Sequence, residues 1–165
     1  MICFTNKGIA TRISDRNSYG MSPRQIINEH YQFTQKNKCP VYFSTNNKQD
    51  RRFKQRLDEI ILFFKEYNQT IYVRAQILRI ESQKTPFIPE DASKFSPAVF
   101  ANDKRCSWYL IEKFEVVKEK DLKDYWYRNN ETMGLEPLIK VVERPRFPKC
   151  YYEFRTDCEN IDNLL

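Results

Sequence analysis

The densest run of apolar residues in this chain spans residues 58–82. From Ile71 to Ile77 apolar and polar positions alternate, which is the pattern of a strand with one buried face. The alternation changes phase after Leu78, and such a one-residue slip predicts a β-bulge. The earlier block, residues 60–64, is continuously apolar, as in a strand buried on both faces. The stretch therefore predicts a β-hairpin whose two halves are separated by Asn68 and Gln69.

A helical interpretation competes for the first half of this stretch. Apolar residues at helical spacing run through it: Phe53, Leu57, Ile60, Ile61 and Phe64. One long helix over residues 50–67 is therefore an alternative to the hairpin. We favour a short helix over residues 51–57 followed by a strand, because the five-residue apolar block is too uniform for an exposed amphipathic helix.

A helix and a strand are predicted upstream of the hairpin. Ser22 is a good N-cap, Pro23 suits the first helical position, and Gln25 completes a capping box. The apolar positions that follow predict a helix over about residues 23–35. His30, the only histidine, falls on the apolar face of this helix, where we expect a packed histidine rather than a catalytic base. Val41–Thr45 has the composition of a strand.

Several shorter elements are predicted in the rest of the chain. Residues 2–4 form a short opening strand, and residues 85–97 form a long Pro-containing loop. One face of a later strand carries the apolar residues Trp108, Leu110, Phe114 and Val116. Asp121 caps a short helix that carries the apolar residues Leu122, Tyr125 and Trp126. The run Leu138–Val142 predicts a last core strand, and residues 151–154 an edge strand or cap.

Composition limits the classes of protein to which the chain can belong. With 165 residues, 41% of them hydrophobic, the chain is expected to fold as one domain over residues 1–165. Its three glycines are too few and too far apart to form a glycine-rich phosphate-binding loop. The five cysteines are widely spaced without metal-ligand spacing, so neither a metal nor another cofactor is expected. Reduced thiols, with no signal peptide and no apolar run of membrane-spanning length, lead us to expect a cytoplasmic protein without a membrane partner.

Positive charge is concentrated in two segments. Lys plus Arg exceed Asp plus Glu by 28 − 22 = 6. Residues 48–56 hold five cations and one anion, and residues 140–155 hold five cations and two anions. Such segments are either solvated faces or sites for the phosphates of a nucleic acid, and the sequence leaves both open.

Four segments follow one another in a characteristic order: VYFST at 41–45, DEIILFF at 58–64, IYVRAQI at 71–77, and, after the Pro-containing loop, SWYLI at 107–111. This order resembles the PUA-like superfamily, particularly its EVE and ASCH branches. The resemblance implies an α+β fold, namely a small mixed β pseudo-barrel with flanking helices. The barrel core would span about residues 40–117, with an N-terminal helix and a C-terminal extension.

The resemblance also implies a function and a set of residues. It implies a non-catalytic protein that binds DNA or RNA, or a modified base, in a cleft bordered by basic residues. The expected contacts to the nucleic-acid backbone are made by Lys48, Arg51, Arg52, Lys104 and Arg105. The expected base-stacking or base-edge contacts are made by Phe43, Ser44, Thr45, Asn46, Trp108 and Tyr109. Core packing is the competing interpretation for the aromatic residues, and an ordinary turn is the competing one for residues 44–46.

Two other functions stay open. A small nucleoside or nucleic-acid hydrolase of ASCH type needs acid/base residues, for which the candidates are Asp58, Glu59, Glu81 and Lys48. A protein–protein module, such as a phage or mobile-element factor that binds a host protein, would use the aromatic residues between 125 and 154. Tyrosine, tryptophan and arginine concentrate binding energy at interfaces, which makes that segment the predicted contact surface.

Overall fold

The predicted hairpin at the centre of the chain is confirmed. In the computed structural model, which describes residues 6–48, 57–128, 134–144 and 149–154, β3 (Glu59–Glu66) and β4 (Gln69–Phe87) pair antiparallel. Tyr67 and Asn68 join them with φ angles of 50° and 64°, as in the two-residue type I′ turn whose twist suits a hairpin. The helical alternative is therefore wrong for residues 59–66. The short helix predicted over residues 51–57 falls outside the described residues, apart from Leu57.

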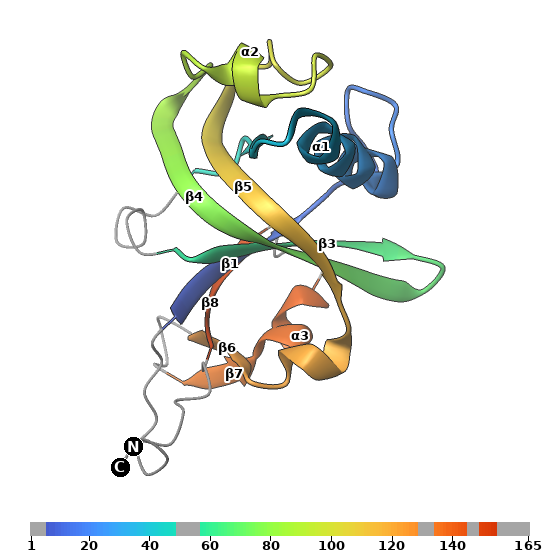
Figure 1. Ribbon diagram of the computed structural model, residues 1–165. Helices are drawn as coiled ribbons and strands as arrows, with labels where there is room; N and C mark the ends of the chain where they lie inside the picture. Colours follow the sequence, from blue (N-terminus) through green and yellow to red (C-terminus); the bar gives the residue numbers. More distant parts are fainter. Residues whose placement is uncertain (1–5, 49–56, 129–133, 145–148, 155–165) are drawn as a thin grey trace, which may run out of the picture.

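Eight described strands form one mixed sheet around this hairpin (Figure 1). The other elements are β1 (Asn6–Arg12), α1 (Pro23–Asn37), β2 (Val41–Thr45), α2 (Ala92–Phe95), β5 (Arg105–Val117), the 3₁₀ helix η1 (Glu119–Leu122), β6 (Tyr125–Arg128), β7 (Leu135–Pro137), α3 (Leu138–Val142) and β8 (Lys149–Phe154). The strand order is β2-β5-β4-β3-β1-β8-β6-β7. Only the β1–β3 pair is parallel among the described pairs. The strands β2 and β7 end the sheet, and no described pairing closes it into a barrel.

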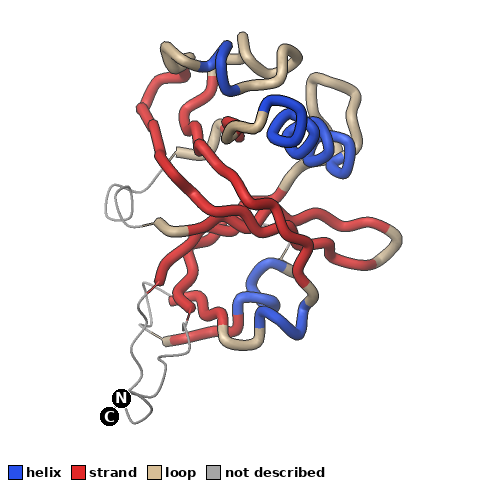
Figure 2. The backbone as a smooth tube through the Cα atoms, viewed as in Figure 1, coloured by secondary structure: helices blue, strands red, loops and turns tan. Residues whose placement is uncertain are grey.

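Helices cover the sheet on both sides of β3 (Figures 1 and 2). The long strands β4 and β5 curve away from β3 toward α1 and α2, whereas α3 lies on the opposite side with β6 and β7. Alternate residues of β3 enter two different cores. Ile60 and Leu62 pack in the core that includes Ile26 of α1, while Ile61 and Phe63 pack in the core that includes α3. This explains the continuous apolar block, because both faces of β3 are buried.

The pairing of β4 with β5 has three register shifts, of which one lies between Ser82 and Phe87 and the other two bear on the sequence predictions. The pairing register shifts between Ile77 and Arg79, so the bulge predicted at Leu78 is confirmed. A second shift lies opposite Lys113, whose φ is +59°. The extra residue there changes which face the following side chains occupy.

The bulge at Lys113 overturns the prediction that four apolar residues share one face of β5. Trp108 and Leu110 pack with α2 in a separate small cluster. Phe114 instead packs on the opposite face, in the core that includes α1. Val116 does not belong to either core, since the residue is 74% exposed. A strict alternation cannot continue through an inserted residue.

The C-terminal elements differ most from those predicted. Residues Leu138–Val142 form a helix rather than a strand, because Leu138, Val141 and Val142 are buried at helical spacing. The helix predicted after Asp121 is wrong: Asp121 lies inside η1 and accepts a hydrogen bond from the Lys118 N–H, and the aromatic pair that follows is on β6. The strand β8 is not an edge strand, since it pairs with both β1 and β6.

The loop predicted over residues 85–97 is shorter than expected. The strand β4 continues to Phe87, and α2 occupies Ala92–Phe95. The opening strand predicted over residues 2–4 falls outside the described residues. The first described strand, β1, begins at Asn6.

We expect substitution of Gly8 by alanine to destabilise the fold. Gly8 lies opposite Tyr152 in the β1–β8 pair, and a Cβ atom added there would lie 2.2 Å from Tyr152 Cζ. The ring cannot move freely, because its hydroxyl donates to Glu59 Oε1 at 2.8 Å and its centroid lies 5.3 Å from that of the Tyr125 ring. Such overpacking should lower the free energy of unfolding by about 1–3 kcal/mol, measured by urea denaturation.

A second substitution tests whether this clash is the cause. In a background carrying Tyr152→Leu, which removes the ring, Gly8→Ala should cost much less than it does in the natural sequence. An equal cost in both backgrounds would show that the ring is not what excludes a side chain at Gly8.

Candidate functional site

A pocket of about 290 Å³ lies where the end of β2 meets the connection between β1 and α1. Its polar lining residues come mostly from these two segments, and its aromatic lining residues come from four separate parts of the chain. The lining residues are Arg12, Ile13, Ser14, Asn17, Tyr19, Ile26, His30, Phe43, Ser44, Thr45, Asn46, Asn47, Phe100 and Arg105. No aspartate or glutamate is among these fourteen residues.

Four aromatic rings form one wall of this pocket. The ring of His30 stacks on Phe100, with 4.7 Å between centroids and 15° between planes, and lies 5.5 Å from Phe43. Tyr19 meets Phe100 edge to face at 4.8 Å. His30, Phe43 and Phe100 are buried and Tyr19 is half-buried. The wall is therefore a packed aromatic layer that presents part of its surface to the pocket.

The start of α1 fixes the position of His30. The Ser22 hydroxyl accepts a hydrogen bond from the Gln25 N–H, and the Gln25 side chain accepts one from the Ser22 N–H, as the capping box predicted. With the helix begun at Pro23, Ile26 and His30 lie one turn apart on the face toward the sheet. His30 Nδ1 donates to the Ile26 carbonyl at 2.6 Å.

Burial keeps the His30 ring neutral. It lowers the pKa of His30 from 6.5 to about 4, only partly opposed by contacts with backbone carbonyls. Because a carbonyl oxygen only accepts hydrogen bonds, the hydrogen of the neutral ring is on Nδ1. The histidine is thus a packed residue, as expected, and is uncharged at neutral pH.

Tyr19 is held in place by two charged residues. Arg105 donates to the Tyr19 hydroxyl at 2.9 Å, and that hydroxyl donates to Asp103. Arg105 and Asp103 also approach each other, with 3.8 Å between nitrogen and oxygen. Asn17 supports the same connection, since its side-chain amide donates to the carbonyls of Ser14 and Met21. These hydrogen bonds hold the hydroxyl end of Tyr19, whose ring forms part of the pocket wall.

The two arginines of the pocket differ in how they are engaged. Arg12 donates to the carbonyls of Val142 and Arg144 at the end of α3, and its guanidinium lies 5.5 Å from the Phe63 ring. This ties β1 to α3 and is a structural role. The side-chain partners of Arg105 among the described residues are Tyr19 and Asp103 at the pocket wall, so it is the cation placed to contact a ligand.

The rim of the pocket formed by residues 44–47 is polar. Ser44 and Thr45 end β2, and Asn46 and Asn47 follow it. Among the described strands β2 is an edge strand that pairs only with β5. The turn is closed by Thr45 Oγ1, which accepts from the Asn47 N–H at 3.2 Å, and by Ser107 Oγ, which donates to the Asn47 carbonyl at 2.7 Å. Ser44 and Asn46 complete this rim, with hydroxyl and amide groups suited to the edge of a heterocyclic base.

The structure brings five of the predicted site residues together. Phe43, Ser44, Thr45, Asn46 and Arg105 all line the pocket. Lys48 follows the rim residue Asn47 and is exposed, and Lys104 is exposed beside Arg105, but neither lines the pocket. The predictions for Arg51 and Arg52 fall outside the described residues.

Two predicted stacking residues are in the core instead. Trp108 is fully buried, and its Nε1 donates to the Phe87 carbonyl at 3.1 Å and the Arg105 carbonyl at 3.3 Å. Tyr109 is buried in the core that includes Ile26. Trp108 and Tyr109 are consecutive on β5 and point to opposite faces of the strand, and each of these faces packs against a buried cluster. Neither ring is available to stack on a ligand.

The carboxylates considered for a hydrolase lie outside the set of described residues that line this pocket. Asp58 accepts a hydrogen bond from the Lys7 N–H at 3.0 Å. Glu59 accepts one from the Tyr152 hydroxyl, and burial raises the pKa of its carboxyl group. Glu81 accepts from the Tyr42 hydroxyl near α2. These three residues and Lys48 are absent from the lining of the pocket.

The aromatic residues of the C-terminal third are mainly core residues. Tyr125 stacks on Phe154 at 4.9 Å with 5° between the ring planes, and both pack with Tyr152. The prediction that this segment forms an exposed contact surface is wrong for these three residues, because β6 and β8 bury them against α3.

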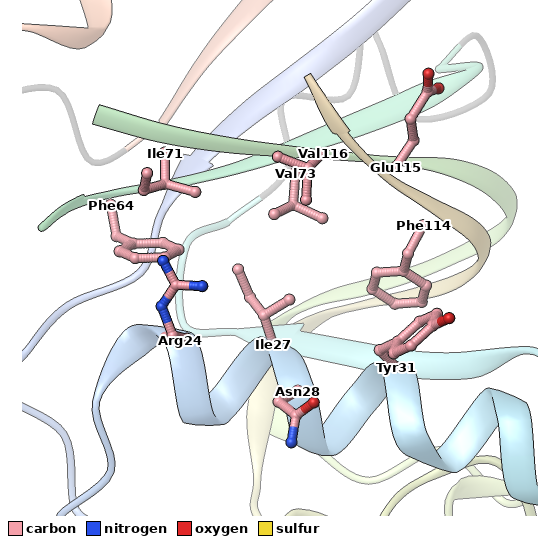
Figure 3. Close-up of a pocket in the computed structure, with 10 residues that line it drawn as sticks. All are labelled: Arg24, Ile27, Asn28, Tyr31, Phe64, Ile71, Val73, Phe114, Glu115 and Val116. Atoms are coloured by element: carbon pink, nitrogen blue, oxygen red, sulfur yellow. The ribbon is translucent and has the colours of Figure 1, made fainter. Parts of the chain in front are cut away.

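A second hollow is a groove of about 330 Å³ between α1 and the tip of the β3–β4 hairpin (Figure 3). We call it the hairpin groove. Apolar side chains of α1 face those of the strands across it. Its lining residues are Arg24, Ile27, Asn28, Tyr31, Phe64, Ile71, Val73, Phe114, Glu115 and Val116. Arg24 pairs with Glu66 at 2.8 Å and Glu115 with Arg74 at 2.7 Å, so both charges of the lining are neutralised within the chain.

The described part of the chain contains no group of three or more His, Cys, Asp or Glu residues that could hold a metal ion. Cys39, Cys106 and Cys150 are free thiols, and burial raises the pKa of Cys150 to about 12. Among the described helices none is long and apolar enough to cross a membrane.

Sequence patterns found the residues of β2 and Arg105 but missed Tyr19, Phe100 and Arg12. Tyr19 lies in a polar segment that reads as a turn, and Phe100 precedes one. No local pattern links either to β2, since the pocket is assembled only when the β1–α1 connection packs beside β5.

Comparisons of the chain with protein-family models, with curated proteins and with solved structures found no match.

Proposed function

We propose that the pocket binds a single base of DNA or RNA, presented by a single strand or flipped out of a duplex, and that the protein does so without catalysis. The observation that carries this proposal is the convergence of aromatic surface, polar rim and an arginine around one pocket. A base offers the matching features, namely a π face, a hydrogen-bonding edge and a nearby phosphate.

Each part of the pocket has a role in the proposal. Stacking of a base on an aromatic side chain contributes about 1–3 kcal/mol, and Tyr19 is the half-buried ring available for it. Ser44 and Asn46 supply side-chain hydrogen-bonding groups for the edge of the base. Arg105 neutralises a phosphate, and the exposed Lys48 and Lys104 extend the positive charge beside it.

The protonation states of the described pocket residues support a non-catalytic role. No aspartate or glutamate is among the described residues that line it, and its histidine is neutral and contacts the backbone carbonyls of Ile26 and Tyr42. General acid–base catalysis needs a group whose pKa is near the working pH and which can reach the reacting atom. The described residues that line the pocket offer binding groups but no such acid/base pair.

We further propose that the curved sheet is a PUA-like pseudo-barrel. In support, β2, β3, β4 and the tryptophan-bearing β5 occur in the expected order, and a bulge bends β4 at Leu78. The core enclosed by these strands is capped by α1. In this proposal the pocket lies at the end of the barrel where β2 leaves the sheet.

The proposal is tested by measuring the affinity of short single-stranded DNA and RNA by fluorescence anisotropy. We expect saturable binding that weakens as salt rises, since phosphate contacts release counterions. Arg105→Ala should weaken binding by about tenfold or more, because it removes a phosphate contact and releases Tyr19. Lys123→Ala, which removes one exposed positive charge near η1, is the matched control and should change affinity little. No binding by the natural sequence, or equal losses in both variants, would contradict the proposal.

A further inference from the structure

The tip of the β3–β4 hairpin combines exposure with an unfavourable backbone conformation. Tyr67 is 93% exposed and has a φ of +50°, in a turn position that favours asparagine or glycine. A bulky residue with positive φ is uncommon and costs stability. Figure 1 shows this tip projecting beyond the rest of the fold. The fold therefore keeps a large aromatic side chain at a protruding position where a small residue would suit the turn better.

The hairpin groove lies directly beside this tip. Glu66, the neighbour of Tyr67, forms the ion pair with Arg24 that bounds one end of the groove. Tyr31 and Phe114, whose rings meet at 6.1 Å, line the part of the groove further along α1 (Figure 3). Val116 is 74% exposed and also lines it. An aromatic protrusion and an apolar hollow large enough for a phenol ring thus occupy the same region of the surface.

The charges of this region indicate what can cover it. The chain has a net charge of +6, so two copies repel each other over most of their surfaces. The hairpin groove is electrically balanced, because Arg24 and Glu115 are both paired within the chain. The neighbouring Lys65 also pairs, with Glu143 at 3.2 Å. The described lining residues of the groove offer no unpaired charge to a phosphate or a charged peptide, and a second copy meets no unpaired like charge in the groove itself.

We propose that the protein forms a symmetric dimer in which Tyr67 of each copy inserts into the hairpin groove of the other. An isologous contact requires a surface that is complementary to itself, and a knob beside a hole of matching chemistry meets this requirement. Tyrosine is also among the residues that most often dominate binding energy at interfaces. This inference does not depend on the base-binding pocket, which is lined by a different set of residues.

The dimer is tested by sedimentation equilibrium on the full chain. The natural sequence should show twice the chain mass, whereas Tyr67→Asn and Val116→Glu should each show the mass of one chain. Asparagine suits a turn position with positive φ, so Tyr67→Asn should unfold at a urea concentration no lower than the natural sequence. Loss of the dimer then cannot be attributed to loss of the fold. Leu78→Glu, at a 46% exposed apolar residue of β4 outside the groove, is the control and should remain dimeric.

Mixing the two monomeric variants tests the reciprocal arrangement. A Val116→Glu chain keeps its tyrosine and a Tyr67→Asn chain keeps its groove, so the mixture should recover one of the two contacts and form a heterodimer. A natural chain that stays monomeric up to ~1 mM would overturn the proposal. So would a dimer that survives Tyr67→Asn, or a mixture that stays monomeric.

Discussion

Replacement of Trp108 by alanine is expected to lower the free energy of unfolding by about 3–5 kcal/mol. The indole is fully buried between β2 and α2, with its ring edge to face against Tyr42 at 5.7 Å. Truncation leaves a cavity in this small cluster. It also removes the donor to the carbonyls of Phe87 and Arg105, which holds the end of β4 to the start of β5. Loss of packing and of these hydrogen bonds act in the same direction.

Urea denaturation of Trp108→Ala measures this effect, and Trp126→Ala provides the matched control. Trp126 is only half-buried, on β6, so its truncation should cost clearly less. A stable Trp108→Ala protein with weakened oligonucleotide binding would contradict the packing role and restore the indole as a stacking residue.

Protonation of His30 is expected to destabilise the fold by about 3 kcal/mol in acid. The pKa of His30 is about 4 in the folded protein and 6.5 in the unfolded chain. A depressed folded pKa means that the unfolded chain binds the proton more tightly. The contribution of the neutral ring is therefore complete above pH 6.5 and is lost as the pH falls toward 4. The size follows from about 1.4 kcal/mol for each unit of pKa difference.

The comparison with His30→Phe isolates this contribution. Phenylalanine keeps a ring against Phe100 and Phe43 but cannot take up a proton. The stability of the natural protein relative to His30→Phe should fall by about 3 kcal/mol between pH 7 and pH 4, measured by urea denaturation. Because carboxylates titrate in both proteins, their effects cancel in the difference. A difference that does not vary with pH would show that the ring is accessible to water and titrates normally.

The fold was predictable where a single periodicity runs through an element. The capping box before α1 and the alternation in β4 are local signals, and both elements form as expected. The five-residue run Leu138–Val142 has no such signal, because a short apolar block suits a strand or a helix equally. Its helical form is decided by packing against β6, β7 and β8, and these tertiary contacts cannot be read from the five residues themselves.

The pocket was predictable only in part for a related reason. Phe43, Ser44, Thr45 and Asn46 are consecutive, so one strand and the turn after it bring them together without tertiary information. Tyr19 and Phe100 reach the same pocket through hydrogen bonds and ring contacts between segments about 80 residues apart. Trp108 shows the opposite failure. Its apolar character suits both a stacking surface and a core, and only the cover provided by α2 distinguishes them.

The most direct test of base binding uses the only histidine of the chain as a probe of the pocket. The ring of His30 gives one set of histidine signals in a proton NMR spectrum, and it lies in the pocket wall. Titration with a short single-stranded oligonucleotide of mixed sequence should shift these signals in a saturable way, because a stacked base adds a ring current beside Phe100 and Phe43. Binding with unchanged His30 signals would place the nucleic acid elsewhere and contradict the assignment of this pocket.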